Sequence, residues 1–507
     1  MLHSDRLQRV MVWLLGAGAA LAAASVLSRA WFEFSSGALD GDALIFQTVG
    51  RGILNGKLPY ADLFESKPPG IFLLHALSLA LFGHQFLVKS IQAVALLLLP
   101  ILIVLPVLGA MKRLSGFEQR MMGLASVLFA CLLTLYTADQ AGLGLTESYA
   151  AFLTLLFLNV AVLWKQSSWK KIAALGCIML LTVGIREPFL LVLLAGMLLL
   201  HTEDDGLLRH FLRISFVRPA AVACVIGIVM LTALGYLGPF FTVYLPHMIG
   251  FHIHQYDTPI LLRSLEVWRV AQNIGRFSWP LAVSVLMLWI MALVHSARSH
   301  GTSRILQWVA ATVCVLIAIA IGGDFYGHHF VAAVPLYAAL WWVGVRDGGM
   351  QSYRTASAVL ACLLITASVS TVKISYAAET KHWREREREF TYVALVLDDV
   401  MDRCKLDHYL QFVTRGGGPY AYAHHSPDGP LFVHYTRFMS ALPRYTRAFN
   451  ESLQAVPLVL MDNLENPDLK EIIKVFLRPN FTTDSPACAG EHFVQPLPYY
   501  ILFRVQN

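Results

Sequence analysis

Long apolar runs alternate with short charged connections along the first three quarters of the chain. Eleven of these runs are candidate membrane spans, because a helix needs about 20 apolar residues to cross a bilayer core. They lie at 10–28, 91–111, 122–137, 149–164, 172–185, 189–201, 219–240, 280–295, 305–322, 329–345 and 356–374. A further apolar run, 70–82, is too short to span and predicts a re-entrant or interfacial helix. The pattern predicts an all-α polytopic membrane protein.

Composition supports this fold class and excludes others. The chain is 56% hydrophobic and 14% charged, whereas soluble domains carry about 25% charged residues. The net charge of +6 lies largely in short connections between spans, so it does not indicate nucleic-acid binding. The first apolar run continues without a clear cleavage site into Trp31-Phe32-Glu33-Phe34, which predicts a retained span with an interfacial aromatic cluster.

The positions of the basic residues predict the orientation in the membrane. Arg6 and Arg9 precede the first span, and every second connection after it is short and basic. These connections carry Lys112, Arg113 and Arg120; Lys165, Lys170 and Lys171; Arg209, Arg213 and Arg218; Arg298 and Arg304; and Arg346 and Arg354. The positive-inside rule therefore predicts a cytoplasmic N-terminus in the inner (cytoplasmic) membrane. The long first loop 29–90, the loops 244–277 and 324–328, and all residues after 373 would face outward.

The composition changes sharply from Lys381 to Asn507, which predicts two domains, a transmembrane domain at 1–375 and an extracytoplasmic domain at 376–507. The second opens with alternating charges at 384–389, typical of a solvated helix. Apolar runs at 392–397, 431–434, 456–461 and 499–505, separated by turns and a helical 468–475, predict a small α/β domain. Cys404 and Cys488 lie there, outside the apolar spans. They are expected to form a disulfide or to remain two buried thiols.

The first outer loop carries the most informative polar residues. Asp40 and Asp42 follow the first span, and residues 43–54 after them are amphipathic enough to lie along the interface. A carboxylate just outside the bilayer is suited to act as a general base, and ionisable groups there are functional candidates. The alternative is that Asp42 only caps the helix that it precedes.

The order of motifs around this loop resembles the GT-C superfamily of integral-membrane glycosyltransferases, which includes protein O-mannosyltransferases and lipid A aminoarabinose transferases. The matching positions are Asp42, Asn55-Gly56-Lys57-Leu58-Pro59-Tyr60, Lys67-Pro68-Pro69 and Leu81-Phe82-Gly83. The usual second acid is replaced by Ala43, which weakens a paired-acid or metal-binding role at that position. Gly327-His328-His329, ahead of Pro335, resembles the family's His-Tyr-x5-Pro segment, with His329 in place of the tyrosine.

The resemblance implies roles for several residues. It makes Asp42 the catalytic base and Glu147, with Asp40, a candidate for acceptor binding. It makes Arg186 a ligand of the donor phosphate, since a guanidinium can hold a phosphate with two hydrogen bonds. Lys67 and His328 are expected to assist it. The alternatives are a helix start for Glu147, a local pair with Glu187 for Arg186, and an interfacial ring for His328.

The outer loop 244–277 is rich in histidine, arginine and aromatic residues, and is expected to form a lid over sugar and phosphate. Arg263 and Arg269 are its candidate phosphate ligands. No metal site is expected, because the chain has no CxxC and no carboxylate–histidine spacing typical of zinc. No cofactor is indicated, and dependence on a divalent metal is left open. Gly416-Gly417-Gly418 is expected to be a flexible turn.

The implied function is transfer of a sugar from a polyprenyl-phosphate donor to a lipid, glycan or protein acceptor, with membrane lipids and no nucleic acid as other partners. Two alternatives remain. A transporter or flippase for lipid-linked saccharides would also line a cavity with charges, although no pair of interrupted repeat helices is visible. An inactive scaffold of the same fold is the other, because Ala43 stands where the second acid is usual.

Overall fold

The computed structural model of the chain describes residues 2–36, 39–112, 114, 116–166, 168–200, 213–254, 258–321, 325–346, 354–373, 375–412, 418–427, 443–461, 474, 477–490 and 493–505. The chain divides into two compact units. Unit 1 comprises Met1–Ser35, Lys89–Val229 and Ile253–Tyr376, and unit 2 comprises Ser36–Val88, Met230–His252 and Ala377–Asn507. The last segment of unit 2 starts next to the predicted domain boundary, but this unit also includes most of the first outer loop.

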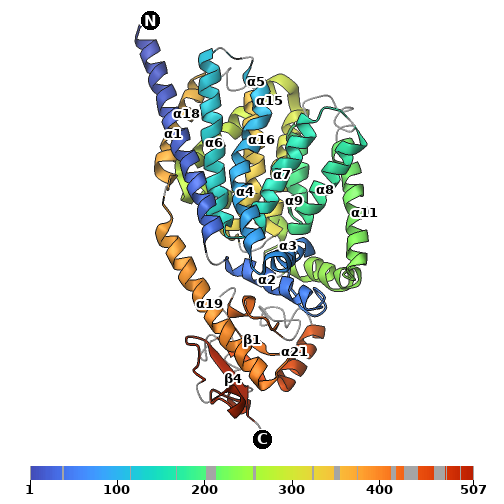
Figure 1. Cartoon of the computed structure of the whole chain (residues 1–507). Helices are drawn as coiled ribbons and strands as arrows, with labels where there is room; N and C mark the ends of the chain where they lie inside the picture. Colours follow the sequence, from blue (N-terminus) through green and yellow to red (C-terminus); the bar gives the residue numbers. More distant parts are fainter. Residues whose placement is uncertain are drawn as a thin grey trace. The chain divides into compact units, whose positions relative to one another are not determined.

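Unit 1 is a bundle of long helices that stand side by side (Figure 1). The helical elements of this unit, long and short, are in chain order α1 (Leu2–Ser35), α4 (Phe86–Val104), η1 (Leu105–Val107), α5 (Leu108–Met111), α6 (Gly116–Ala141), α7 (Thr146–Leu163), α8 (Trp169–Ile185), α9 (Phe189–Leu200), η2 (Arg213–Val217), α11 (Arg218–Ala233, of which the residues to Val229 belong to unit 1), α14 (Ile260–Ser264), α15 (Val267–Ile321), η5 (Gly327–Ala333), α16 (Val334–Arg346) and α18 (Arg354–Thr371). Helix α1 packs on α6, α7 on α8, and α9 on α15. Their apolar side chains form one continuous core.

The 55-residue helix α15 is two membrane-crossing arms joined by a bend. Trp289 Nε1 lies 3.4 Å from Thr312 Oγ1, 23 residues further along the chain. A straight helix would separate these residues by about 35 Å, so the helix folds back between them. The arms Val267–His295 and Thr302–Ile321 are each long and apolar enough to cross a membrane. They correspond to the two spans predicted at 280–295 and 305–322.

Eight helices in the described part of the chain are long and apolar enough to cross a membrane, so the predicted count of eleven is not confirmed. The difference lies in three predicted spans. Helix α8 has 17 residues, α9 has 12, and the apolar part of α18 is Ser357–Thr371. The polytopic helical fold itself is confirmed.

Unit 2 begins with two short helices that pack on each other, α2 (Gly41–Leu54) and α3 (Pro69–Phe82). Helix α3 is the short apolar helix expected at 70–82. The loop between them is anchored by Tyr60, which is fully buried, lies 4.8 Å from Tyr244 between ring centroids, and donates a hydrogen bond from its hydroxyl to the Lys67 carbonyl at 2.7 Å. Unit 2 also contains α12 (Leu237–Pro239), η3 (Phe240–Tyr244), α13 (Leu245–His247) and η4 (Met248–His252).

The C-terminal segment of unit 2 has the predicted α/β character. Its long helix α19 (Ala377–Cys404) is followed by a four-stranded sheet in the order β1-β2-β4-β3, in which β1 and β2 are parallel and the other pairs antiparallel. Its remaining elements are β1 (Leu410–Phe412), η6 (Pro419–Ala421), α21 (Pro443–Ala455), β2 (Leu458–Met461), α23 (Arg478–Asn480), β3 (Phe481–Thr482), η9 (Ala487–Ala489) and β4 (Tyr500–Arg504). The run 431–434, residues 416–417 and most of the helix expected at 468–475 lie outside the described residues.

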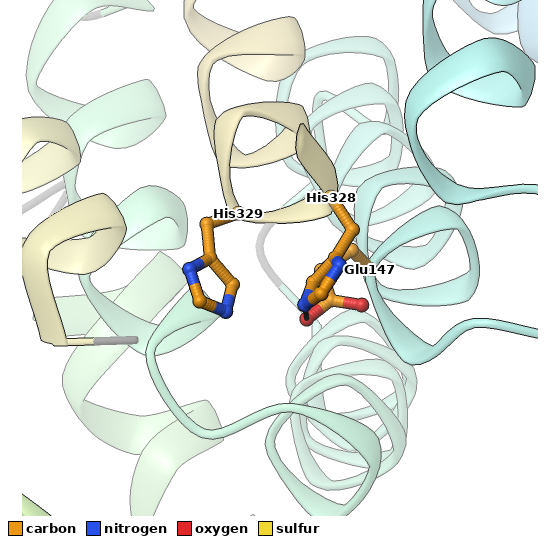
Figure 2. A group of neighbouring side chains, drawn as sticks. All are labelled: Glu147, His328 and His329. Carbon is orange, nitrogen blue, oxygen red and sulfur yellow. Dashed lines mark ion pairs between the residues drawn. The ribbon is translucent and has the colours of Figure 1, made fainter. Parts of the chain in front are cut away.

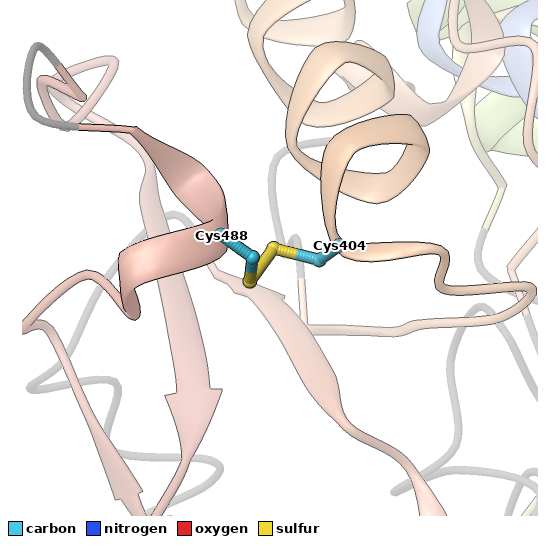
Figure 3. Close-up of a disulfide and its surroundings, with 2 residues drawn as sticks. All are labelled: Cys404 and Cys488. Carbon is cyan, nitrogen blue, oxygen red and sulfur yellow. A yellow bond between two sulfur atoms is a disulfide. The ribbon is translucent and has the colours of Figure 1, made fainter.

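Cys404 at the end of α19 and Cys488 in η9 form a disulfide, with their Cα atoms 5.1 Å apart (Figure 3). The first of the two expected alternatives is therefore the one observed. The bond ties the long helix to the segment between β3 and β4.

Candidate active site

In unit 1, Arg186, His328 and His329 lie near the carboxylate of Glu147. Figure 2 shows Glu147 with the two histidines. Arg186 Nε lies 2.9 Å from Glu147 Oε1, and His328 Nε2 lies 3.9 Å from the same oxygen. The Thr146 hydroxyl donates a hydrogen bond to Glu147 Oε2 at 3.0 Å. The ligand atoms of Glu147, His328 and His329 all lie within 4.8 Å of one another. The structure thus brings together three of the predicted site residues and adds His329.

Local chain geometry explains the Glu147–Arg186 pair. Helix α7 begins at Thr146, so Glu147 stands in its first turn, where a carboxylate is favourable beside the helix dipole. Helix α8 ends at Ile185 and Arg186 is extended, which leaves its side chain at the helix end. The Arg186 and Glu147 side chains are 6% and 2% exposed, so this is a buried ion pair between two helices. Breaking such a pair is costly, because a charge is left buried without its counterion.

The start of η5 is held close to α6 by a glycine. A Cβ on Gly327 would lie 2.5 Å from Gln140 Oε1, so a larger residue would require the Gln140 side chain to move. Gln140 in turn accepts a hydrogen bond from Asn273 at 3.0 Å, and Asn273 accepts one from the Tyr136 hydroxyl at 2.5 Å. This network lies beside the helix start that carries the two histidines.

Glu33 was expected only as part of an interfacial aromatic cluster, but it belongs to a buried network. It is 1% exposed, pairs with Arg29 at 2.7 Å, and accepts a hydrogen bond from the Leu143 amide at 2.5 Å. Arg29 also donates to the Ala138 carbonyl at 2.8 Å. These contacts hold the turn that leads into Glu147. The spacing of four residues between Arg29 and Glu33 was the available signal, because such residues are neighbours on one helix face.

In unit 2, the two acids of the first loop have different environments. Asp40 is the N-cap of α2, and its carboxylate accepts a hydrogen bond from the Asp42 amide at 3.2 Å. The cap is therefore Asp40, not Asp42 as the alternative interpretation had it. Asp42 is partly exposed, and its carboxylate accepts no hydrogen bond and forms no ion pair among the described residues. A carboxylate in this state is available to take a proton.

The other end of α2 is tied to the C-terminal segment of the same unit. Gln47 donates a hydrogen bond to the Ala421 carbonyl at 2.7 Å, and Arg51 donates to the same oxygen at 3.3 Å. Burial lowers the pKa of Arg51, while the negative charge of Asp398 opposes this shift. Lys57 donates to the Pro427 carbonyl at 2.8 Å. The helix that carries Asp42 and the loop after it are thus supported by residues 370–374 positions later in the chain.

The three remaining predicted phosphate ligands make local contacts. The Lys67 ammonium lies 5.9 Å from the centre of the Phe46 ring. Arg263 is buried and donates to the Ile253 carbonyl at 3.0 Å. Arg269 pairs with Glu266, and its guanidinium lies 4.7 Å from the Phe325 ring centre. Arg269 keeps 40% of its side chain exposed, so it remains accessible to a ligand.

Comparisons with known proteins identify the fold. No protein-family model and no curated protein sequence matches the chain. The crystal structure of ArnT from Cupriavidus metallidurans bound to undecaprenyl phosphate is similar, with a TM-score of 0.55, 14% identity, and coverage of 96% of this chain and 97% of that one. The apo structure of the same ArnT gives a TM-score of 0.54 over the same coverage. ArnT is a lipid A aminoarabinose transferase of the GT-C type. At this identity the likeness establishes the fold alone: the chain has an ArnT-like fold, with the helical membrane part and the small α/β part that were expected.

Proposed function

We propose that the protein is a membrane glycosyltransferase that moves a sugar from a polyprenyl-phosphate donor to an acceptor at the outer face of the cytoplasmic membrane. The observation that carries the proposal is the shared fold over nearly the whole of both chains, with a protein whose crystal structure holds undecaprenyl phosphate. A lipid donor also fits the predicted orientation, since nucleotide sugars remain in the cytoplasm.

Asp42 is the proposed general base. It would remove the proton from the acceptor hydroxyl or amine, and the acceptor would then attack the anomeric carbon and displace the lipid phosphate with inversion. The absence of any cap or ion pair on its carboxylate among the described residues supports this role over the capping role. Asp40, proposed earlier as an acceptor ligand, has a structural function as the cap.

Arg186 is the proposed ligand of the donor phosphate, with Lys67, His328, Arg263 and Arg269 as further cationic or hydrogen-bonding groups. As the bond to the sugar breaks, negative charge grows on the phosphate, and a preorganised guanidinium stabilises it. Glu147 pairs with Arg186 Nε at 2.9 Å and so helps to fix the orientation of the guanidinium. We therefore extend the role of Glu147 from acceptor binding to the orientation of Arg186.

In the direct test, the purified full-length protein in lipid is mixed with a membrane extract that contains acceptors. The members of a panel of radiolabelled polyprenyl-phosphate sugars are then added one at a time. Transfer of label from one donor, with release of polyprenyl phosphate, is the expected result. If donors are moved across the bilayer but none is consumed, the protein is a flippase. If neither process occurs with any donor in the panel, the transferase proposal fails.

The outward orientation has its own test. Alkaline phosphatase fused after Asn507 should be active in a bacterial host, whereas a fusion at Ser115 should be inactive. The reason is that alkaline phosphatase becomes active only outside the cytoplasm. The reverse pattern would overturn the orientation and the argument for a lipid donor.

A further inference from the structure

Glu147, His328 and His329 form a set of ligand types that a transition-metal ion uses. A carboxylate and two imidazoles, with one position left open, are the protein ligands of many zinc sites. All three ligand atoms lie within 4.8 Å of one another, and the described part of the chain holds no other group of three such residues this close. In a tetrahedral zinc site the ligand atoms are about 3.3 Å apart. Side-chain rotations that move these ligand atoms by about 1–1.5 Å would therefore close the set around an ion.

We infer that Glu147, His328 and His329 bind a divalent transition-metal ion, for which Zn²⁺ is the appropriate probe. No metal site was expected, because the sequence has no carboxylate–histidine spacing typical of zinc. Glu147 and His328 are 181 residues apart, and the fold brings them together. The two adjacent histidines lie in the first turn of η5, with ring centroids 4.4 Å apart and ring planes at 82°.

The surroundings of these residues are those of a metal site. Ligating groups are held by hydrogen bonds from a second layer of residues. Thr146 donates to one oxygen of Glu147 and Arg186 lies against the other. The Tyr326 ring stacks on His328, with planes at 13° and centroids 5.8 Å apart. Glu147 and His329 are buried, while 18% of the His328 side chain is exposed, which leaves an entry path for the ion.

The positive charge of Arg186 is the strongest argument against a second cation here. A carboxylate has two oxygens and about four lone-pair positions, so Glu147 can keep Arg186 and also bind the ion. The set of Glu147, Arg186 and neutral histidines has no net charge, and a divalent ion would make it +2. A site with that charge and an open ligand position favours an anionic oxygen, for which inorganic phosphate is the simplest probe. Only this last step, the use of the ion at a donor phosphate, rests on the proposed function.

The test measures metal binding without any sugar donor. Full-length protein in detergent is stripped with a chelator, returned to phosphate-free buffer at neutral pH, and titrated with Zn²⁺ while bound metal is measured by mass spectrometry. We expect one ion per chain. His328→Ala and His329→Ala should each weaken binding at least 10-fold, and the control His84→Ala, at an exposed histidine, should leave it unchanged.

Two results would overturn the inference: no stoichiometric zinc on the wild-type protein, or one zinc that is retained equally by both histidine variants. If a variant does not fold, X-ray absorption at the zinc edge of the wild-type protein decides instead, because two imidazoles and oxygen ligands are required. If the wild-type protein binds zinc but transfers no sugar from any donor, the result counts against the proposed function alone. If the wild-type protein transfers sugar but binds no zinc, the result counts against the metal site alone.

Discussion

In unit 1 the charged residues of the candidate site are buried and paired, whereas in unit 2 Asp42 is partly exposed and its carboxylate has no partner among the described residues. The pair Glu147–Arg186 is held between two helix ends, so its geometry is preorganised and its loss costs stability. Asp42 instead stands on a helix whose two ends are secured by other residues, Asp40 at the start and Gln47 and Arg51 further along.

This contrast fits a division of chemical work. A group that stabilises developing charge acts best when it is fixed before the reaction, because no reorganisation is then needed. A general base must accept a proton and release it, so a carboxylate already engaged in a cap or an ion pair is poorly suited. We therefore expect substitutions in unit 1 to change stability and binding together, and substitution of Asp42 to change activity alone.

The largest expected effect is on Asp42. Asp42→Asn should reduce transfer by about 10²–10⁴-fold, the usual contribution of a general base, and leave folding intact. Asp40→Asn is the matched control, because asparagine is as good an N-cap as aspartate. Initial rates of label transfer and thermal unfolding curves for both variants provide the measurement. An active Asp42→Asn beside a dead Asp40→Asn would identify Asp40 as the base.

Substitution of Arg186 should lower both stability and donor affinity. Arg186→Ala leaves the Glu147 carboxylate buried without its partner, which typically costs about 3–5 kcal/mol. Arg186→Lys should also be impaired, because an ammonium cannot reproduce the planar guanidinium. The double variant Arg186→Ala with Glu147→Gln separates the two effects, since it should recover much of the stability and none of the donor affinity. Full donor affinity in the double variant would remove Arg186 from the phosphate site.

Hydropathy and charge are sufficient to predict the helices, because the cost of polar groups in lipid leaves a strong, local signal. The short helix α3 was predicted in the same way, from a run too short to span. The number of membrane spans predicted from hydropathy is not confirmed, since eight of the described helices, not eleven, are long and apolar enough to cross a membrane. Some apolar runs form helices shorter than a bilayer requires, as α8 and α9 do in the described residues, and hydropathy alone does not set helix length.

The site was only partly predictable, because its residues are far apart in the sequence. Glu147, Arg186 and His328 were each recognised singly, but nothing local indicates that one carboxylate meets the other two side chains and His329. The role of Asp40 as the cap in place of Asp42 depends on where α2 begins, and helix starts are uncertain by one or two residues in sequence patterns. The fold decides such details.

The next prediction concerns how much the disulfide stabilises the C-terminal segment of unit 2. It closes a loop of 84 residues, so Cys404→Ala with Cys488→Ala should lower stability by about 4–5 kcal/mol in the chain-entropy model. Cys362→Ala, at an exposed free cysteine, is the control. Thermal unfolding and limited proteolysis of the C-terminal segment would show the difference. Unchanged unfolding and proteolysis in the double variant would mean that contacts such as Gln47–Ala421 suffice without the covalent bond.

The smallest expected effect concerns His247 of unit 2, which is buried and packs its ring on Phe64 at 4.8 Å. Burial lowers its pKa from 6.5 to about 4. The unfolded chain therefore binds more protons than the folded one between about pH 6.5 and pH 4, and stability falls as the pH drops through that window. By pH 5 the loss is at most about 2 kcal/mol. His247→Gln should flatten this dependence, measured as the difference in Tm between pH 7.5 and pH 5, whereas His382→Gln at an exposed histidine should not. An equally steep dependence in His247→Gln would show that other groups control the acid response.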